Sequence, residues 1–374
     1  MADNKDKKVL NVPALRFPEF SREWKRHKLS EICSFYSGGT PSSSKKEFYN
    51  GNIPFIRSGE LHKDKTELFI TEDGLNSSAA KLVEIGDLLL ALYGATSGDI
   101  AISKIKGAIN QAILCIRTKQ NKKFIESVWN KHVERLLQTY LQGGQGNLSA
   151  DIVKNIPFYF ADLEEQDKLA NFISLLDERI STQNKIIEKL QSLIKGLRVC
   201  CMQRVYGNNV YLSEIAQIYQ PQTISSTELT EDGFLVYGAN GIIGKYKDYN
   251  HETEQICITC RGNTCGMVNY TKPMSWITGN AMVINTDKYQ DKVCKRYLYH
   301  YLSAYNFNSI ISGSGQPQIV RTPLEKLKIT LPTISEQKQK AIIFDKIQDK
   351  IDINHKVLNL YIGQKQYLLR QMFI

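Results

Sequence analysis

The longest helical pattern in the chain is residues 164 to 203, EEQDKLANFISLLDERISTQNKIIEKLQSLIKGLRVCCMQ. Two series of mostly apolar residues recur in it every seven positions, like the a and d positions of a coiled coil. The first series is Ile173, Ile180, Ile187, Ile194 and Cys201, and the second is Leu169, Leu176, Gln183, Leu190 and Leu197. The stretch therefore predicts a long helix with one face packed against a partner helix.

The same pattern returns 171 residues later, near the C-terminus. Its seam residues are Phe344, Ile347, Ile351, Asn354, Leu358, Tyr361, Leu368 and Met372. Gln183 and Asn354 place an amide at the same seam position, which costs stability but fixes the register of a coiled coil. Lys365 interrupts the second seam, and we expect fraying or solvent exposure to begin there. Two unrelated amphipathic helices are the alternative, which the match along the whole seam disfavours.

Both helical stretches begin with the same capping pattern. Asp162 precedes Glu165 by three residues, and Thr333 precedes Glu336 by three. In a capping box the Asp or Thr oxygen accepts a backbone N–H, and the Glu side chain reaches back to the cap residue. We expect this arrangement at both starts.

The duplication extends beyond the helices. Leu29–Ile32 and Leu212–Ile215 have the same sequence, Leu-Ser-Glu-Ile, and each opens a region of short apolar runs separated by Gly, Ser, Asn and Asp. Such runs predict strands and turns. The predicted strands are 53–56, 68–70, 87–93, 100–102 and 112–116 in the first region and 235–237, 255–260, 267–270 and 282–284 in the second. A helix is predicted after each set, over 123–140 and 291–305.

The chain thus predicts an α+β protein made of two similar mixed α/β domains and two long helices that form an antiparallel coiled coil, an internal duplication with two-fold character. The predicted parts are an N-terminal arm over 1–27, a first domain over 28–161, a central helix over 162–206, a second domain over 207–332 and a C-terminal helix over 333–374.

Composition points to a soluble protein with a polyanionic partner. Of 374 residues, 42% are hydrophobic and 23% charged, and the net charge is +10. Such a charge favours nucleic acid as partner, although excess Lys also serves solubility. The charged start does not resemble a signal peptide, and no run approaches the roughly 20 apolar residues of a membrane span. We therefore expect a cytoplasmic protein that does not bind membranes, with its eight cysteines reduced.

The sequence shows none of the common catalytic motifs. It lacks a phosphate-binding P-loop, a dinucleotide-binding glycine motif and a nucleophile elbow. Residues 52–55 and 155–158, both Asn-Ile-Pro-Phe, resemble a methyltransferase loop, but Ile replaces its second residue and no cofactor loop accompanies them. Cys257, Cys260 and Cys265 are better explained as buried thiols than as a zinc site without a fourth ligand. We predict no catalytic residues, no metal and no cofactor of its own.

Polar loops that follow the predicted strands carry the candidate DNA contacts. Asn and Gln bond adenine through two contacts, Arg does so with guanine, and Lys and Arg contact phosphates. The predicted DNA-binding residues of the first domain are Gly39, Thr40, Lys45, Lys46, Arg57, Ser58, Tyr93, Thr96, Ser97, Asn110, Gln111, Gln145 and Asn147. Those of the second are Tyr237, Asn240, Lys245, Arg261, Asn263, Thr264, Asn280, Gln316, Gln318 and Arg321.

Several of these loops are duplicated. Residues 94–98 match 262–266, Asn110-Gln111-Ala112 resembles Gly279-Asn280-Ala281, and Gly144-Gln145 matches Gly315-Gln316. A doubled set of reading loops fits a two-part site on duplex DNA. The alternative is a coiled-coil interaction scaffold without sequence-specific DNA binding, which the basic charge and the duplicated loops disfavour.

The arrangement resembles the specificity subunits of type I restriction-modification enzymes. The resemblance rests on the start Pro13–Phe20 with Trp24, the stretches 37–42 and 51–55, the Glu-Gln pairs at 165–166 and 336–337, and the stretch 236–244. In place of the Gly-Gly-Thr-Pro loop, the second domain has Gln220–Thr223, which leaves the role of that loop open. The resemblance covers nearly the whole chain.

This resemblance implies a non-catalytic subunit with two target recognition domains, each of which reads half of a bipartite, asymmetric site on double-stranded DNA. It also implies two modification subunits that supply methyl transfer from S-adenosylmethionine, and restriction subunits that use ATP and Mg²⁺. A helix of about 35 residues is on the order of 50 Å long. We therefore expect the paired helices to set the spacing between the two half-sites, which lie about 34 to 36 Å apart for one turn of DNA.

Overall fold

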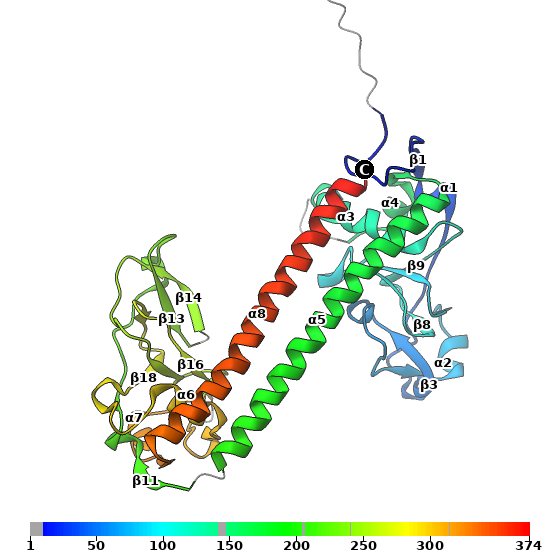
Figure 1. The fold of residues 1–374 in the computed structure, drawn as a ribbon. Helices are drawn as coiled ribbons and strands as arrows, with labels where there is room; N and C mark the ends of the chain where they lie inside the picture. Colours follow the sequence, from blue (N-terminus) through cyan, green and yellow to red (C-terminus); the bar gives the residue numbers. More distant parts are fainter. Residues whose placement is uncertain (1–9, 141–146, 204–205, 240, 314) are drawn as a thin grey trace, which may run out of the picture. The chain divides into compact units, whose positions relative to one another are not determined.

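The computed structural model describes residues 10–140, 147–203, 206–239, 241–313 and 315–374. The chain divides into two compact units (Figure 1). Unit 1 comprises Met1–Gln183 and Val357–Ile374, and unit 2 comprises Asn184–Lys356. Each unit therefore contains one sheet domain and one half of each long helix.

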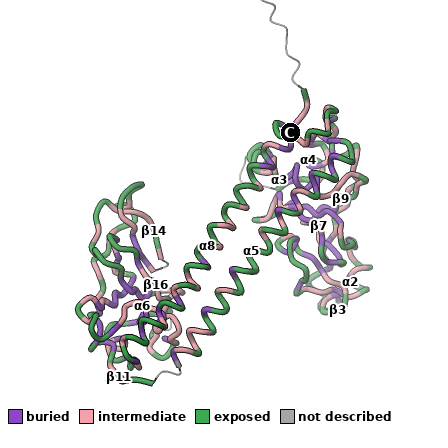
Figure 2. Tube along the Cα trace, in the orientation of Figure 1, coloured by how far each residue is buried: buried purple, intermediate pink, exposed green. Residues whose placement is uncertain are grey.

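The two predicted long helices are present as α5 (Leu163–Gln203) and α8 (Ile334–Met372). Every predicted seam residue of α5 is buried or half-buried, while Leu175, Ile186 and Leu193, which lie off the seam, are exposed. Along α5 as a whole, exposed positions alternate with buried and half-buried ones (Figure 2). The heptad pattern of α5 is therefore confirmed at the level of single residues.

The end of α8 differs from the expectation at Lys365. This residue forms an ion pair with Asp177 of α5, with 2.5 Å between the charged atoms. Leu368, Leu369 and Met372 beyond it are buried. The helix neither frays nor becomes exposed at Lys365, because a carboxylate on the facing helix compensates the charge at the seam.

Both helices complete the hydrophobic core of each unit. In unit 1, Leu169 and Ile173 from the start of α5 share one core with Leu368 and Met372 from the end of α8. In unit 2, Ile194 from the end of α5 shares a core with Phe344 and Ile351 from the first half of α8. The two helices therefore run antiparallel in each unit, as predicted.

The starts of α5 and α8 show the first bond of the predicted capping box, and at α5 the second bond is replaced. The Glu165 N–H donates to Asp162 Oδ1 at 3.1 Å, and the Glu336 N–H donates to Thr333 Oγ1 at 3.3 Å. Glu165, however, accepts two bonds of 2.7 Å from the Arg16 guanidinium and one of 3.1 Å from Trp24 Nε1. The Glu165 carboxylate therefore binds the N-terminal arm instead of the cap residue Asp162, because Arg16 brings a charged donor to a buried position.

A buried glutamine attaches each sheet domain to its long helix. In unit 1, Gln166 Oε1 accepts the N–H of Asn121 at 3.1 Å, and its Nε2 donates to the carbonyl of Ala161 at 2.8 Å. In unit 2, Gln337 Oε1 accepts the N–H of Cys294 at 2.9 Å, and its Nε2 donates to the carbonyl of Pro332 at 2.9 Å. The second residue of each Glu-Gln pair therefore joins the long helix to the start of the domain helix.

The sheet domain of unit 1 contains a four-stranded sheet of order β2-β9-β6-β7 and a second of order β4-β3-β8-β5. β1 pairs with β10 beside the start of α5. The elements are β1 (Lys25–Lys28), α1 (Leu29–Ile32), β2 (Cys33–Ser37), β3 (Tyr49–Ile56), β4 (Phe69–Ile70), α2 (Glu72–Asn76), β5 (Lys81–Val83), β6 (Leu88–Ala91), β7 (Ile100–Ile102), β8 (Gly107–Ile109), β9 (Ile113–Thr118), α3 (Lys122–Tyr140), α4 (Ala150–Asn155) and β10 (Pro157–Phe160).

Unit 2 repeats this topology with a sheet of order β12-β18-β15-β16, a second of order β14-β13-β17, and the pair β11-β19. Its elements are β11 (Asn208–Tyr211), β12 (Gln217–Tyr219), β13 (Phe234–Gly238), β14 (Gly241–Tyr246), β15 (Ile256–Thr259), β16 (Val268–Tyr270), β17 (Trp276–Ile277), β18 (Ala281–Asn285), α6 (Lys295–Ala304), α7 (Arg321–Glu325) and β19 (Lys328–Leu331). The predicted strands correspond to β3, β4, β6, β7 and β9 and to β13, β15, β16 and β18. The internal duplication is confirmed.

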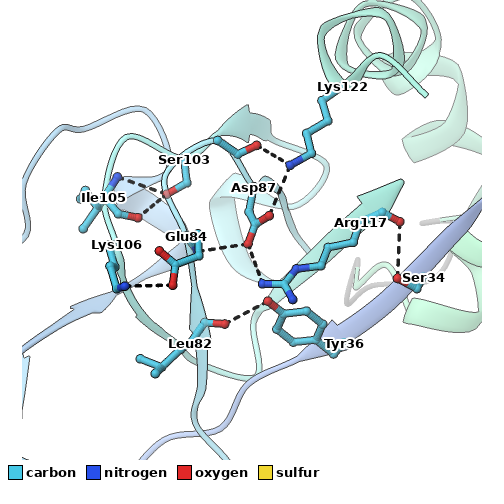
Figure 3. Close-up of polar contacts among 11 residues, drawn as sticks. Ser34, Tyr36, Leu82, Glu84, Asp87, Ser103, Ile105, Lys106, Arg117 and Lys122 are labelled. Carbon is cyan, nitrogen blue, oxygen red and sulfur yellow. Dashed lines mark hydrogen bonds and ion pairs between the residues drawn. The ribbon is translucent and has the colours of Figure 1, made fainter. Parts of the chain in front are cut away.

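A charged cluster closes one end of the sheet in unit 1 (Figure 3). Asp87 is buried and accepts from Arg117 Nη2 at 3.0 Å, from Lys122 Nζ at 3.3 Å and from the Glu84 N–H at 3.0 Å. Burial would raise the pKa of Asp87, but the three donors hold it below its ordinary value. The cluster thereby ties the start of β6 to the start of α3.

We expect Asp87→Asn to lower the free energy of unfolding by about 2 kcal/mol at pH 7, because the bonds to two cations lose their charge. A folded pKa below the unfolded value of about 3.9 stabilises the fold above that pH. The difference from the native chain should therefore close as the pH falls through the lower folded pKa. Thermal melts of both chains between pH 7 and pH 3 measure this. Glu84→Gln is the control, since the Glu84–Lys106 pair is exposed.

Candidate nucleic-acid interface

Three connections of unit 1 meet at one edge of its sheet. β2 and β6 end there, at Ser37 and Ala91, while the neighbouring β9 begins there at Ile113. The pairings Ser37↔Leu114, Ala91↔Ile113 and Leu90↔Ile100 place these strand ends and the start of β7 together. The predicted residues of the loops after β2 and β6 and before β9 are thus brought side by side.

The second sheet adds the loop after β3 to the same edge, and its strand β8 leads into the loop before β9. β3 and β8 are parallel, with Ile56 opposite Ile109, so both end at one edge. Arg57 and Ser58 follow β3, and Asn110 and Gln111 follow β8. We call this set the loop edge of unit 1: Gly38, Thr40, Arg57, Ser58, Tyr93, Thr96, Ser97, Asn110, Gln111 and Asn147.

Hydrogen bonds hold these loops against one another. The Gly38 N–H donates to the Asn110 carbonyl at 3.2 Å, and Thr40 Oγ1 donates to Gln111 Oε1 at 2.6 Å. The Leu92 carbonyl accepts from Ser97 Oγ at 3.0 Å and from the Leu148 N–H at 2.9 Å. Thr40, Gln111 and Asn147 are exposed, so the edge presents hydroxyl and amide groups to solvent on a fixed backbone.

Unit 2 builds the same edge from the ends of β12 and β15 and the start of β18. The Ile319 N–H donates to the Cys260 carbonyl at 3.0 Å, as Leu148 does to Leu92. Arg261 lies next to Cys260 and forms a backbone bridge with Gln318. We call this set the loop edge of unit 2: Gln220, Thr223, Arg261, Asn263, Thr264, Asn280, Gln316 and Gln318.

The strand register shifts one sequence match by one residue. Ala91 pairs with Ile113, and Thr259 pairs with Ala281. Accordingly the Leu92 N–H donates to the Ala112 carbonyl at 2.8 Å, and the Cys260 N–H donates to the Asn280 carbonyl at 3.2 Å. Asn280 therefore corresponds to Ala112 in the structure, and Gly279 corresponds to Gln111.

Gln220 is a residue of this edge that the sequence reasoning missed. Tyr36 faces Cys115 and Tyr219 faces Val283, which aligns Gly38 with Pro221. Proline has no N–H, so unit 2 cannot make the bond that Gly38 donates. Gln220 Nε2 donates instead to the Gly279 carbonyl, at 3.1 Å. Pro221 could have indicated this from the sequence, because it lacks the N–H that Gly38 donates at the matching position of unit 1.

Several basic side chains at or near these edges are bound to carboxylates. Arg57 makes bonds of 3.2 and 2.9 Å to Glu60, which is buried. Burial would raise the pKa of Glu60, but the bonds from Arg57 and Thr66 lower it. Lys245 pairs with Asp232 at 3.3 Å and Arg321 with Glu325 at 2.6 Å. These pairs orient the cations while leaving them partly exposed.

Some predicted residues lie elsewhere. Tyr237 is a correction: its ring is only 6% exposed and its hydroxyl accepts the Lys272 N–H at 3.1 Å, because β13 turns this side chain into the core. Gly39 is buried against Ala79. Lys45 and Lys46 precede β3, at the opposite end of that strand from Arg57. Lys245 lies on β14 opposite Leu235, away from the end at which β13 leads into β14. Gln145 and Asn240 lie outside the described residues.

The cysteines with zinc-like spacing do not form a metal site in the part of the chain that the structure describes. Cys257 and Cys260 are buried free thiols, as expected, whereas Cys265 is a free thiol that is only half-buried. Burial raises the pKa of Cys257. In the described ranges, no three His, Cys, Asp or Glu side chains are grouped so as to hold a metal ion. The helices described for this chain include none that is long and apolar enough to cross a membrane.

Comparison with known proteins places both sheet domains in one family. The family model described as "Type I restriction modification DNA specificity domain" matches residues 21–192 and again residues 208–360. The EcoprrI type I restriction enzyme specificity subunit of Escherichia coli is 25% identical over 85% of this chain and 86% of its own length. The MjaVIII specificity subunit of Methanocaldococcus jannaschii is 24% identical over 94% of this chain and 92% of its own.

Solved structures share the fold. The type I restriction-modification S subunit from M. genitalium superimposes with a TM-score of 0.64 at 17% identity, covering 97% of this chain and 99% of that one. A chain from a study of complex assembly and conformational transition of the type I system gives a TM-score of 0.57 at 15% identity, covering 94% and 97%. Their likeness supports the duplicated architecture described above.

Proposed function

Since the chain belongs to the family of type I restriction-modification DNA specificity subunits, we propose that its two loop edges bind duplex DNA and that each reads one half of a split recognition site. The specificity subunit recognises DNA and is not catalytic. The finer assignment, to individual loops and residues, is our proposal. It rests on the geometry of the two edges.

The observation that carries this proposal is the pairing of a common backbone with different side chains. The same backbone bond occurs at both edges: the Leu148 N–H donates to the Leu92 carbonyl in unit 1, and the Ile319 N–H donates to the Cys260 carbonyl in unit 2. The residues displayed on this frame differ, with Tyr93 in one unit where Arg261 stands in the other. A fixed frame that carries variable polar groups suits the reading of two different base sequences.

We propose that cations around the edges contact phosphates and set the register of each domain. Arg57 and Arg321 are partly exposed at or next to the loop edges, which suits this role. Lys45, Lys46 and Lys245 are also at least partly exposed but lie farther from the loop edges. Phosphate contacts fix orientation without reading sequence, so these residues should affect both cognate and unrelated DNA.

We propose that the long helices bind the partner subunits. Leu193, Ile342 and Leu360 are exposed on α5 and α8, and a bound partner subunit would cover such apolar side chains. The partners would be two modification subunits, which bind S-adenosylmethionine, and restriction subunits, which bind ATP and Mg²⁺. A cytoplasmic location suits this role. The functional parts would be the arm 1–27, the recognition domains 28–161 and 207–332, and the helices 162–206 and 333–374.

Two single substitutions test the assignment of one half-site to each edge. Gln111→Ala should relax base preference in one half of the site, and Asn280→Ala in the other, because each removes an exposed amide from a loop edge. A good amide contact to a base contributes about 1–3 kcal/mol of discrimination, or roughly 10- to 100-fold. Methylation mapping of DNA from cells that express each variant with its modification subunits measures the preference at every position.

Asn209→Ala is the matched control, since Asn209 is an exposed amide on β11, before the start of the sheet rather than at its loop edge. It should leave both half-sites unchanged. Relaxation of both halves by a single edge variant, or of neither half by both variants, would refute the assignment.

A further inference from the structure

Three exposed apolar side chains lie next to the loop edge of unit 2, and a surface that reads bases only through amides and cations does not account for them. Ile242 is 55% exposed, Ile243 is 48% exposed and Met267 is 51% exposed. The two isoleucines follow Gly241, the first residue of β14. Neighbouring exposed apolar side chains rimmed by polar groups, unlike a single exposed one, are typical of a binding surface.

Strand pairing places this hairpin tip at the loop edge. β13 and β17 are parallel, with Tyr237 opposite Ile277, so both strands end on one side. Asn280 follows β17, and the β13–β14 turn follows β13. The Thr259 hydroxyl donates to the Ala239 carbonyl, which joins the turn to the end of β15 and hence to Arg261. Ile242 and Ile243 are thus continuous with the proposed DNA-reading residues.

The backbone of the hairpin keeps both isoleucines outside the core. Tyr237 pairs with Ile242, but the register then shifts, so that Val236 pairs with Gly244 and Ile243 has no direct partner. A Cβ added to Gly238 would lie 3.0 Å from Ile243 Cγ2, so the glycine gives Ile243 room across the strand. This bulge lets two consecutive β-branched residues remain exposed at one tip.

Unit 1 has different chemistry at the matching place. The parallel pair β3 and β8 corresponds to β13 and β17, and the residues after β3 are Arg57 and Ser58. One unit therefore presents a guanidinium held by Glu60, while the other presents branched aliphatic groups. An aliphatic group beside amide and guanidinium donors suits the C5-methyl group of thymine.

We infer that Ile242 and Ile243 contact a thymine methyl group in the major groove of the half-site read by unit 2. This inference rests on the proposed function and adds a specific base requirement to it. The half-site of unit 2 should contain an A·T pair at which the methyl group itself is read, and the half-site of unit 1 should show no such dependence on these residues.

Deoxyuridine tests this inference, because it differs from thymidine by the methyl group alone. The full chain, bound to its modification subunits, is titrated with labelled duplexes in which each thymine of the mapped site is replaced in turn. The native chain should lose about fourfold in affinity at one position in the half-site of unit 2, the value for one buried carbon group. The variant with Ile242→Ala and Ile243→Ala should bind the thymine and uracil duplexes equally.

Ile85→Ala is the matched control, since Ile85 is 69% exposed and lies beside Asp87, at the end of unit 1 away from its loop edge. It should keep the full preference for thymine. The inference is overturned if that half-site contains no A·T pair, if uracil has no effect at any position, or if the double variant keeps the preference. Arg261→Ala distinguishes failure of the methyl contact from failure of the proposed function. If Arg261→Ala lowers the affinity for DNA but uracil has no effect on the native chain, only the methyl contact is refuted. If neither Arg261→Ala nor uracil lowers the affinity, DNA binding by the loop edge of unit 2 is refuted as well.

Discussion

Duplication of one heptad in each long helix, residues 181–187 of α5 and 351–357 of α8, should lengthen the spacer of the DNA site and leave both half-sites unchanged. Seven residues add about 10 Å to a helix, and DNA rises about 3.4 Å per base pair, so the spacer should grow by roughly three base pairs. A whole heptad preserves the seam, because Ile180 and the next seam residue keep their spacing. Methylation at the native spacing should disappear.

Three base pairs also rotate one half-site by about 100° relative to the other, so methylation at the new spacing should be weaker than in the native enzyme. Methylation mapping by single-molecule sequencing gives both spacer and half-sites. Duplication in α5 alone is the control, since it shifts one seam against the other and should abolish methylation. If the doubly lengthened chain still methylated the native spacing, the helices would not determine it.

Gly38→Ala should disrupt the loop edge of unit 1. A Cβ at this position would lie 1.7 Å from the carbonyl oxygen of Ile109, far inside van der Waals contact. The loop would have to move away from β8, and the bond from the Gly38 N–H to the Asn110 carbonyl would be lost. We expect a loss of about 3 kcal/mol in the free energy of unfolding of unit 1.

The functional result should be the loss of one half-site. Methylation should fall at least tenfold in cells, and the melting temperature of the purified chain should drop. Gly59→Ala is the matched control, since nothing lies within 4 Å of the added Cβ and the position is in the same domain. A Gly38→Ala chain with native stability and native methylation would contradict the role of this close approach.

The long helices could be predicted from sequence because their pattern is local and repeated. A heptad sets which side chains are buried through helical geometry alone, and Ile173, Ile187 and Ile194 are buried as expected. The interruption at Lys365 could not be interpreted in the same way. Its partner, Asp177, lies on the other helix and nearly two hundred residues earlier, so no local pattern reveals the ion pair.

The capping prediction failed in part for the same reason. Spacing alone gives Glu165 a local backbone partner, but tertiary structure brings Arg16 to it with two bonds of 2.7 Å. A charged pair at a buried position outcompetes a bond to a single N–H. The role of the N-terminal arm in holding the start of α5 followed only from the structure.

The sequence could predict which residues belong to the loop edges, but not which of their side chains are exposed or how the strands align them. Strand-end position grouped residues such as Thr40 and Gln111, which the structure joins by a 2.6 Å bond. Tyr237 was misassigned because sequence alternation does not state which face of a short strand is covered. Gln220 and the one-residue shift at Asn280 depend on strand register, which the motif match did not contain.

The attachment of each sheet domain through Gln166 and Gln337 has an evolutionary consequence. The two amides accept an N–H at the start of the domain helix and donate to a backbone carbonyl just before the long helix. All four of these bonds are made to backbone N–H or carbonyl groups, so they do not depend on the side chains of the domain. A recognition domain from another gene that offers the same backbone groups would attach to the long helices without further changes. New target sequences are therefore expected to arise by exchange of whole domains between genes rather than by gradual change of one domain.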